Sequence, residues 1–187
     1  MTALRPTELR HHLIGELLRI LLRSVPGRKG WGPRLRLETG QANSALGYDD
    51  LVLQIRSEPR ILKVARRVVA AVCACSGLSP CQTSDVVLAV NEATTNAVKY
   101  GSPAGPEDFV TIRFARSDSA LAVSVTDHGS GFRHKNLESF SGTGLLPSAG
   151  LGLLIIRQLS DDLKIQNDTH GATVSIVKLM SPLAKAA

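Results

Sequence analysis

The sequence lacks several features that would each have indicated a class of protein. None of its apolar runs reaches the ~18 residues that a membrane-spanning helix requires. Charges interrupt the apolar residues near the N-terminus and no small-residue cleavage site follows them, so this end does not resemble a secretory signal peptide. The three cysteines, Cys73, Cys75 and Cys81, are odd in number and show no metal-binding spacing. These absences favour a cytoplasmic protein whose cysteines are buried or half-buried thiols.

Two common nucleotide-binding motifs are missing as well. There is no Walker A sequence, and no Gly-x-Gly-x-x-Gly follows the first predicted strand, so the P-loop and Rossmann folds lose support. Aromatic residues make up only 4% of the chain, and no basic stripe with interleaved aromatics runs through residues 49–187, which argues against direct nucleic-acid binding. The adjacent His11 and His12 cannot face one metal from a helix, so we assign no metal role to histidine.

Charge divides the chain near residue 48. Residues 1–48 hold eight Lys/Arg and three Asp/Glu, whereas residues 49–187 hold 14 and 13. Most of the net charge of +6 therefore belongs to an N-terminal extension. The remainder is long enough for one domain with its own core. We predict a basic extension over residues 1–48, one globular domain over residues 49–181 and a short tail over residues 182–187.

The extension itself is predicted to hold an amphipathic helix and a linker. Residues 8–23 carry one apolar side, formed by Leu9, Leu13, Leu17, Ile20 and Leu21. Pro26-Gly27 ends this helix, and residues 27–48 read as a poorly ordered linker. Three interpretations stay open: a solvated tail or a start codon assigned too far upstream, a helix that binds a partner or a membrane surface, and a helix that packs on the main domain.

The main domain combines strands and helices without regular alternation. Strands are predicted over residues 51–56, 109–116, 120–127, 163–166 and 172–179, and helices over residues 61–75, 80–100 and 151–159. Ser79 and Gln82 form a capping box with Pro80 at the first helical position. This order predicts a two-layer α/β sandwich: a mixed, mostly antiparallel sheet with helices on one face, rather than a doubly wound parallel sheet.

Glu92 and Asn96 lie four residues apart in the predicted helix over residues 80–100 and therefore share one face. The carboxylate of Glu92 can take a proton from an attacking hydroxyl. The amide oxygen of Asn96 is a suitably hard ligand for Mg²⁺. Because the surrounding helix is largely apolar and the neighbouring residues are small, this pair predicts a ligand site instead of a solvated stripe.

Asp127 ends the predicted strand over residues 120–127. A carboxylate at this position can accept a hydrogen bond from an exocyclic amine such as adenine N6, whereas guanine would present a carbonyl and be repelled. Gly129 and Gly131 would let the backbone turn tightly beside a flat base. Alone, the same residues also fit an ordinary turn.

Gly150 and Gly152 lie at the start of the predicted helix over residues 151–159. Unpaired backbone N–H groups and the helix dipole favour phosphate oxygens there. The long segment over residues 128–149 is expected to be a functional lid or disordered, with Gly142 and Gly144 as hinges. A simple helix cap in a glycine-rich loop is the alternative.

Taken in order, these motifs resemble those of the GHKL, or Bergerat, ATP-binding superfamily. Glu92-Ala-Thr-Thr-Asn96-Ala is similar to its N box and Asp127-His-Gly-Ser-Gly131 to its first glycine box. Gly150-Leu-Gly-Leu153 is similar to its second glycine box, and Gly171-Ala-Thr173 to its late Gly-x-Thr element. The resemblance covers roughly residues 50–180 and implies the Bergerat fold.

Within the superfamily, the chain most resembles the anti-sigma-factor serine/threonine kinases. No phosphoacceptor-histidine helix pair is expected before the domain and no further domain after it, which disfavours sensor kinases and the gyrase, chaperone and mismatch-repair ATPases. The segment Asn96-Ala-Val-Lys-Tyr100 is nevertheless also common in sensor kinases. The resemblance implies an ATP-dependent kinase that binds a sigma factor, phosphorylates an anti-anti-sigma partner on Ser or Thr, and forms a homodimer.

The resemblance also implies a role for each candidate residue. ATP and Mg²⁺ would bind with Asn96 as the metal ligand and Asp127 reading adenine, and Glu92 would be the general base. The remaining nucleotide contacts would come from Lys99, Gly129, Gly131, Gly150, Gly152 and Thr173. Two other hypotheses stay open: a non-catalytic ATP-binding adaptor, and a detached sensor-histidine-kinase ATPase domain that acts on a separate protein.

Overall fold

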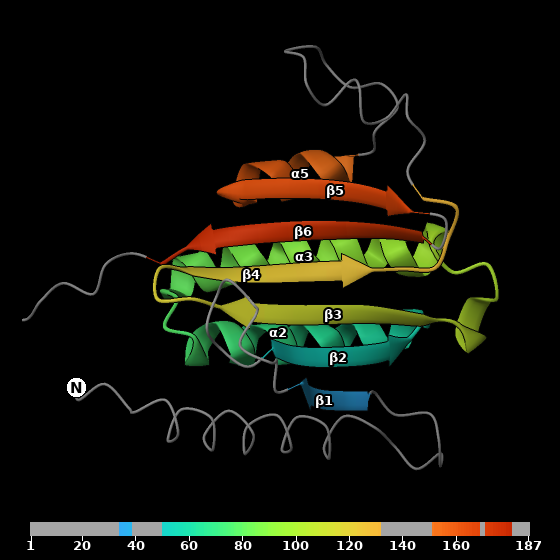
Figure 1. Cartoon of the computed structure of the whole chain (residues 1–187), viewed down its shortest axis with the longest axis horizontal. Coiled ribbons are helices and arrows are strands. Elements are labelled where there is room, and N and C mark those ends of the chain that lie inside the picture. Colours follow the sequence, from blue (N-terminus) through green and yellow to red (C-terminus); the bar gives the residue numbers. More distant parts are fainter. Residues whose placement is uncertain (1–33, 39–49, 132–150, 169–170, 181–187) are drawn as a thin grey trace, which may run out of the picture.

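The computed structural model describes residues 34–38, 50–131, 151–168 and 171–180, of which residues 34–38, 50 and 168 are described by their backbone alone. A six-stranded sheet forms one layer, and three α-helices lie behind it in Figure 1. The strands are β1 (Arg34–Glu38), β2 (Asp50–Arg56), β3 (Phe109–Arg116), β4 (Ala120–Thr126), β5 (Asp162–Asp168) and β6 (Gly171–Leu179). The helices are α2 (Leu62–Cys75), α3 (Pro80–Tyr100) and α5 (Leu151–Leu159), with short 3₁₀ turns at η1 (Pro59–Ile61) and η2 (Gly105–Glu107).

The strand order across the sheet is β1-β2-β3-β4-β6-β5, and each neighbouring pair is antiparallel. The prediction of a two-layer sandwich with a mostly antiparallel sheet is confirmed. The parallel pair that a mixed sheet would contain is not found among the described strands. The short connections between β3 and β4 and between β5 and β6 require antiparallel pairs, because a parallel pair needs a long crossover connection; β2–β3 and β4–β6 are joined through helices, so connection length does not decide their direction.

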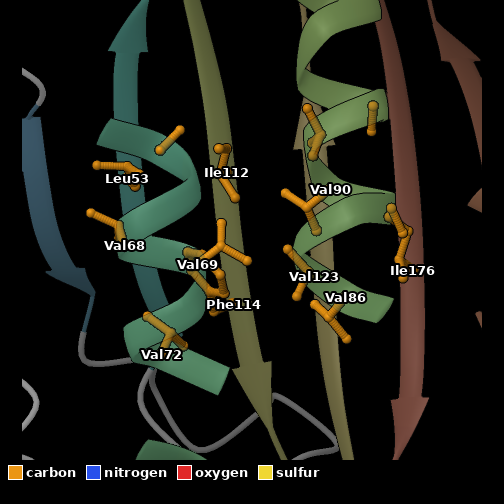
Figure 2. Packing of buried hydrophobic residues seen from close by; sticks show 14 of the residues in the cluster. Leu53, Val68, Val69, Val72, Val86, Val90, Ile112, Phe114, Val123 and Ile176 are labelled. Atoms are coloured by element: carbon orange, nitrogen blue, oxygen red, sulfur yellow. The ribbon is translucent and has the colours of Figure 1, made fainter. Parts of the chain in front are cut away.

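The two faces of the sheet differ in chemistry. On β3 and β4 every second residue is buried against the helices, including Ile112, Phe114 and Val123. Figure 2 shows these side chains packed with Val68, Val69 and Val72 of α2 and with Val86 and Val90 of α3. Each fully buried aliphatic side chain contributes about 1.5–3 kcal/mol to folding. The opposite face of β4 and β6 carries hydroxyl side chains such as Ser124 and Ser175.

Helix α3 is the central element of the helical layer. Its predicted start is confirmed: the hydroxyl of Ser79 accepts the backbone N–H of Gln82 at 3.2 Å, and the side-chain oxygen of Gln82 accepts the backbone N–H of Ser79 at 3.1 Å. Its end at Tyr100 matches the prediction as well. α3 packs against both α2 and α5. The side of α3 that packs against α5 therefore faces the helix that contains Gly152 of the second glycine motif.

The linker predicted over residues 27–48 needs correction, because β1 lies inside it and pairs with β2 from Arg34↔Gln54 to Glu38↔Asp50. Leu35 and Leu37 alternate with charged residues, a period-two pattern that the glycine-rich flanks obscured. The sheet thus extends beyond the predicted domain boundary at residue 49. The predicted helix over residues 8–23, most of the segment over residues 128–149 and the tail lie outside the described residues.

The state of the cysteines and the polarity of the helices were both predicted from composition. The three cysteines form no disulfide among the described residues: Cys73 is buried and Cys75 half-buried, as predicted, whereas Cys81 is exposed near the start of α3, which corrects the prediction for this residue. Burial raises the pKa of the Cys73 thiol to about 12, so this cysteine is an unreactive core residue. In the part of the chain that the structure describes, each helix is too short or too polar to cross a membrane.

Candidate functional site

Helices α3 and α5 bring together three residues predicted from separate motifs. A Cβ atom built on Gly152, near the start of α5, would lie 3.1 Å from Oε2 of Glu92 and 3.5 Å from Nδ2 of Asn96. The glycine backbone therefore lies directly against the carboxylate and the carboxamide. Residues about sixty positions apart in the sequence form one cluster, which we call the α3–α5 cluster: Glu92, Asn96 and Gly152.

The polar side chains of this cluster are not used by the scaffold. Glu92 and Asn96 are half-buried, and neither side chain forms a hydrogen bond or ion pair with the residues that the structure describes. Thr94, between them in sequence, differs, because its hydroxyl donates to the carbonyl of Val90 at 2.7 Å. Because both side chains are half-buried and form no polar contact with the described residues, the carboxylate and the amide are accessible to a ligand.

Asp127 follows β4 and is held by the start of β6. Its backbone N–H donates to the carbonyl of Ala172 at 3.0 Å. Its Oδ1 accepts the backbone N–H groups of Gly129 at 2.9 Å and of Ala172 at 3.2 Å. Its Oδ2 has no hydrogen-bond partner among the described residues and so remains free as an acceptor.

The environment of Asp127 opposes its ionisation. Burial raises the pKa of this carboxyl group, and it outweighs the lowering effects of the N–H groups of Gly129 and Ala172 and of the nearby His128. A raised pKa on a partly buried carboxyl group beside a helix end is typical of functional sites. It also means that a ligand able to donate a hydrogen bond to Oδ2 would relieve part of the desolvation.

The end of α3 connects Asp127 to the α3–α5 cluster. The backbone N–H of His128 donates to the carbonyl of Gly101 at 3.1 Å. A Cβ atom on Gly129 would lie 2.5 Å from the Cα of Gly101, and one on Gly101 would overlap the carboxyl group of Asp127. Because Gly101 follows the last residue of α3, Asn96 and Asp127 belong to the same end of the molecule.

Gly131, expected in a turn beside a flat base, lies against strand β5 in the structure. It has a φ of +73°, and a Cβ there would lie 3.0 Å from the side-chain amide carbon of Asn167 in β5. The conformational freedom of Gly131 thus permits a tight turn, as predicted, but the described structure places this turn against β5.

Thr173 does not join the site. In the β4–β6 register it lies opposite Thr126, and the two hydroxyl oxygens are 3.0 Å apart. Its neighbours Ala172 and Val174 are buried on the helical side, so Thr173 points to the other face of the sheet. The prediction of an adenine contact by Thr173 is therefore corrected, and Ala172 occupies the position beside Asp127.

Two further predicted contacts are not tested by the described residues. Lys99 is exposed, and its ammonium nitrogen lies 5.5 Å from the centroid of the Tyr100 ring, so its contact with a phosphate stays a prediction. Gly150 lies outside the described residues, as do Gly142 and Gly144.

Sequence reasoning missed the backbone of Ala172 and the steric roles of Gly101 and Gly171. Gly101 directly follows the predicted helix over residues 80–100, and no local signal indicates that it lies against Asp127. Strand alternation places residue 127 on the helical face, but the pairing of Asp127 with Ala172 depends on the register of β4 against β6, which the sequence does not reveal.

The described donor set limits how a metal could be held. No group of three His, Cys, Asp or Glu side chains among the described residues could hold an ion by itself. A divalent ion at the α3–α5 cluster would depend on the amide oxygen of Asn96 and on oxygens supplied by the ligand. This suits Mg²⁺, which usually keeps few protein ligands beside phosphate oxygens and water.

The sequence is similar to a family of ATPase domains and to several bacterial protein kinases. The sequence model of the histidine kinase-like ATPase domain family matches residues 55–178. The serine-protein kinase RsbW of Bacillus licheniformis is 29% identical over 140 residues, which cover 71% of this chain and 87% of the relative. RsbW of Bacillus subtilis strain 168 is 27% identical over 140 residues, with the same coverage. RsbW of Listeria monocytogenes serotype 4a is 26% identical over 141 residues, covering 72% of this chain and 89% of the relative.

A solved structure shares the fold. The crystal structure of the RsbU and RsbW domains of Rv1364c from Mycobacterium tuberculosis aligns with a TM-score of 0.52 and 20% identity, covering 70% of this chain and 33% of that chain. At this identity the likeness concerns the arrangement of helices and strands alone.

Proposed function

The chain belongs to the histidine kinase-like ATPase domain family, and from that premise we propose that it is an ATP-dependent protein serine/threonine kinase that acts as an anti-sigma factor. The relatives named serine-protein kinase RsbW, of which the chain covers 87–89%, support this branch. The single observation that carries the proposal is the α3–α5 cluster, in which a carboxylate and an amide without polar partners among the described residues lie against a glycine. The proposed partners are a sigma factor and an anti-anti-sigma protein, and the proposed form is a cytoplasmic homodimer.

The base of the nucleotide would be read by Asp127. Its Oδ1 is occupied by two backbone N–H groups, which leaves Oδ2 to accept a hydrogen bond from an exocyclic amine. Adenine carries such an amine. Guanine carries a carbonyl at the same place, and its oxygen would face the carboxylate unfavourably.

The phosphates would lie between α3 and the start of α5. The N-terminal turn of α5 offers backbone N–H groups, and Gly152 permits close approach without a side chain. Asn96 would hold Mg²⁺ through its amide oxygen. When bound, the ion neutralises charge on the phosphoryl group that is transferred.

Glu92 would act as the general base toward the incoming hydroxyl. Its carboxylate lies between α3 and α5, half-buried and without a polar partner in the described part of the chain, and can accept a proton from a Ser or Thr side chain. General-base assistance contributes roughly 10²–10⁴ in rate. Most of the remaining acceleration in phosphoryl transfer comes from positioning and charge neutralisation.

The decisive experiment is incubation of the full-length chain with radiolabelled ATP, Mg²⁺ and full-length anti-anti-sigma proteins from its own organism. A kinase of this branch yields an acid-stable phosphoserine or phosphothreonine on one of them. ATP binding without transfer to any of them would instead support a non-catalytic adaptor. An acid-labile product on a histidine-bearing protein would support a detached sensor-kinase domain.

A further inference from the structure

Gly171, the first residue of β6, lies directly against the backbone of Asp127. It has a φ of +148°, and a Cβ atom there would overlap the carbonyl oxygen of Asp127 and lie 2.7 Å from its carbonyl carbon. Real Cβ atoms do not approach other heavy atoms this closely. Only glycine therefore allows β6 to begin at this distance from the end of β4.

This close approach lets Ala172 fix Asp127 from two sides. The carbonyl of Ala172 accepts the backbone N–H of Asp127 at 3.0 Å, and the N–H of Ala172 donates to Oδ1 of Asp127 at 3.2 Å. A second donor, the N–H of Gly129, reaches the same Oδ1 at 2.9 Å. Two donors on one oxygen determine the rotation of the carboxylate and direct Oδ2 away from the β6 backbone.

We propose that the start of β6, Gly171 and Ala172, is a positioning device for base recognition: it fixes Oδ1 of Asp127 so that Oδ2 is presented to the amine of the nucleotide. This inference rests on the proposed function, in which Asp127 reads adenine. It adds that selectivity for the amine depends on a glycine in another strand, 44 positions away in the sequence.

The test compares two nucleotides that differ only in the amine. ATP and purine riboside triphosphate, which has hydrogen in place of the amino group, are titrated calorimetrically into the full-length chain with Mg²⁺. The wild-type chain is expected to prefer ATP by about tenfold to a hundredfold, the range for a hydrogen bond to a charged group. In Gly171→Ala, β6 must shift away from Asp127, so the preference falls to about onefold while the analogue binds nearly as before.

Gly105→Ala is the matched control. Gly105 also has a positive φ, +58°, but a Cβ there would meet no atom within 4 Å. This variant carries the same kind of backbone strain without the collision, and it is expected to retain the wild-type preference for ATP. Thermal unfolding of both variants separates local rearrangement from loss of the fold.

A second variant tests the orientation of the carboxylate if Gly171→Ala does not fold. In Asp127→Asn the two backbone donors should retain the amide oxygen at the Oδ1 position, which places the amide N–H₂ at the Oδ2 position. The preference should then reverse, so that inosine triphosphate, with a carbonyl at position 6, binds more tightly than ATP. Retained preference for ATP in Asp127→Asn would overturn the inference.

The outcomes separate this inference from the proposed function. Equal affinity of the wild-type chain for ATP and the analogue, or no binding of either, would refute base recognition by Asp127. A wild-type preference for ATP that persists in folded Gly171→Ala would refute only the positioning role of β6.

Discussion

The two halves of α3 use their polar side chains in opposite ways. In the first half, Gln82 donates to the carbonyl of Leu179 at 2.7 Å, and Asp85 forms an ion pair with Lys178 at 3.0 Å. In the second half, Glu92 and Asn96 have no such partners among the described residues. The comparison teaches that the polar side chains of one helix can be divided by position: paired ones fix its start, and the two without described partners are available for the ligand that we propose.

The largest effect is expected from Glu92→Gln, which keeps the size and neutralises the proposed base. Phosphoryl transfer to the partner should fall by roughly 10²–10⁴, while the ATP affinity and the melting temperature stay near wild type. Asp85→Asn, a matched change in the anchored half, should lower the melting temperature and leave the transfer rate per folded molecule unchanged. Equal transfer rates in Glu92→Gln and wild type would remove Glu92 from the mechanism.

Replacing Lys178 tests the anchored half. Its ammonium nitrogen lies 3.0 Å from Asp85, 3.7 Å from Asp161 and 3.1 Å from the carbonyl of Leu159, and the side chain is only 11% exposed. Lys178→Met should lower the free energy of unfolding by about 1–3 kcal/mol, between the values for exposed and buried ion pairs. Denaturant unfolding measures this loss. A change in ATP affinity without a loss of stability would contradict the division of α3 into two halves.

A smaller effect is expected at the cap of α3. Ser79→Ala removes the acceptor for the N–H of Gln82 and should cost about 1 kcal/mol, or about 2–4 °C in melting temperature. Ser84→Ala is a suitable control, because the Ser84 hydroxyl only donates to the carbonyl of Pro80 within the same helix. If both variants melt at the same temperature, the capping box does not anchor the helix.

The smallest expected effect is a pH dependence from Asp127. Burial raises the pKa of this carboxyl group above its ordinary value of 3.8 in the folded chain. Since folding then favours the protonated form, ionised Asp127 lowers stability at neutral pH, and this cost disappears as the pH falls through the raised pKa. Asp127→Asn should therefore melt at or slightly above the wild-type temperature at pH 7, with the difference vanishing in acid. A lower melting temperature for Asp127→Asn at pH 7 would contradict this sign.

Local signals in the sequence were sufficient for most of the described elements but not for β1 or for the contacts between elements. The capping box at Ser79 and the helical periodicity after it predicted α3 from Pro80 to Tyr100, because both signals are local. β1 was missed, since five residues of alternation are short beside a glycine-rich flank and the strand depends on pairing with β2.

The candidate site shows the same limit. The spacing of Glu92 and Asn96 placed both on one helical face, and the structure adds Gly152 from α5. Thr173 was assigned to the site although it points to the opposite face of the sheet, and Ala172 was overlooked. Thr173 was assigned from the resemblance to the Gly-x-Thr element, although its alternation with the apolar Ala172 and Val174 already favours the opposite face. The pairing of Ala172 with Asp127 depends on the register between two strands, which no local pattern gives.

The central claim is that the unsatisfied half of α3 binds a nucleotide. Isothermal titration of ATP with Mg²⁺ into the wild-type chain and into Asn96→Ala tests it most directly. The account predicts saturable binding to the wild-type chain and at least about tenfold weaker binding to Asn96→Ala, the loss expected for one ligand worth about 1.4 kcal/mol or more. Absence of heat from millimolar ATP with the folded wild-type chain, or equal affinity of the two proteins, would contradict it.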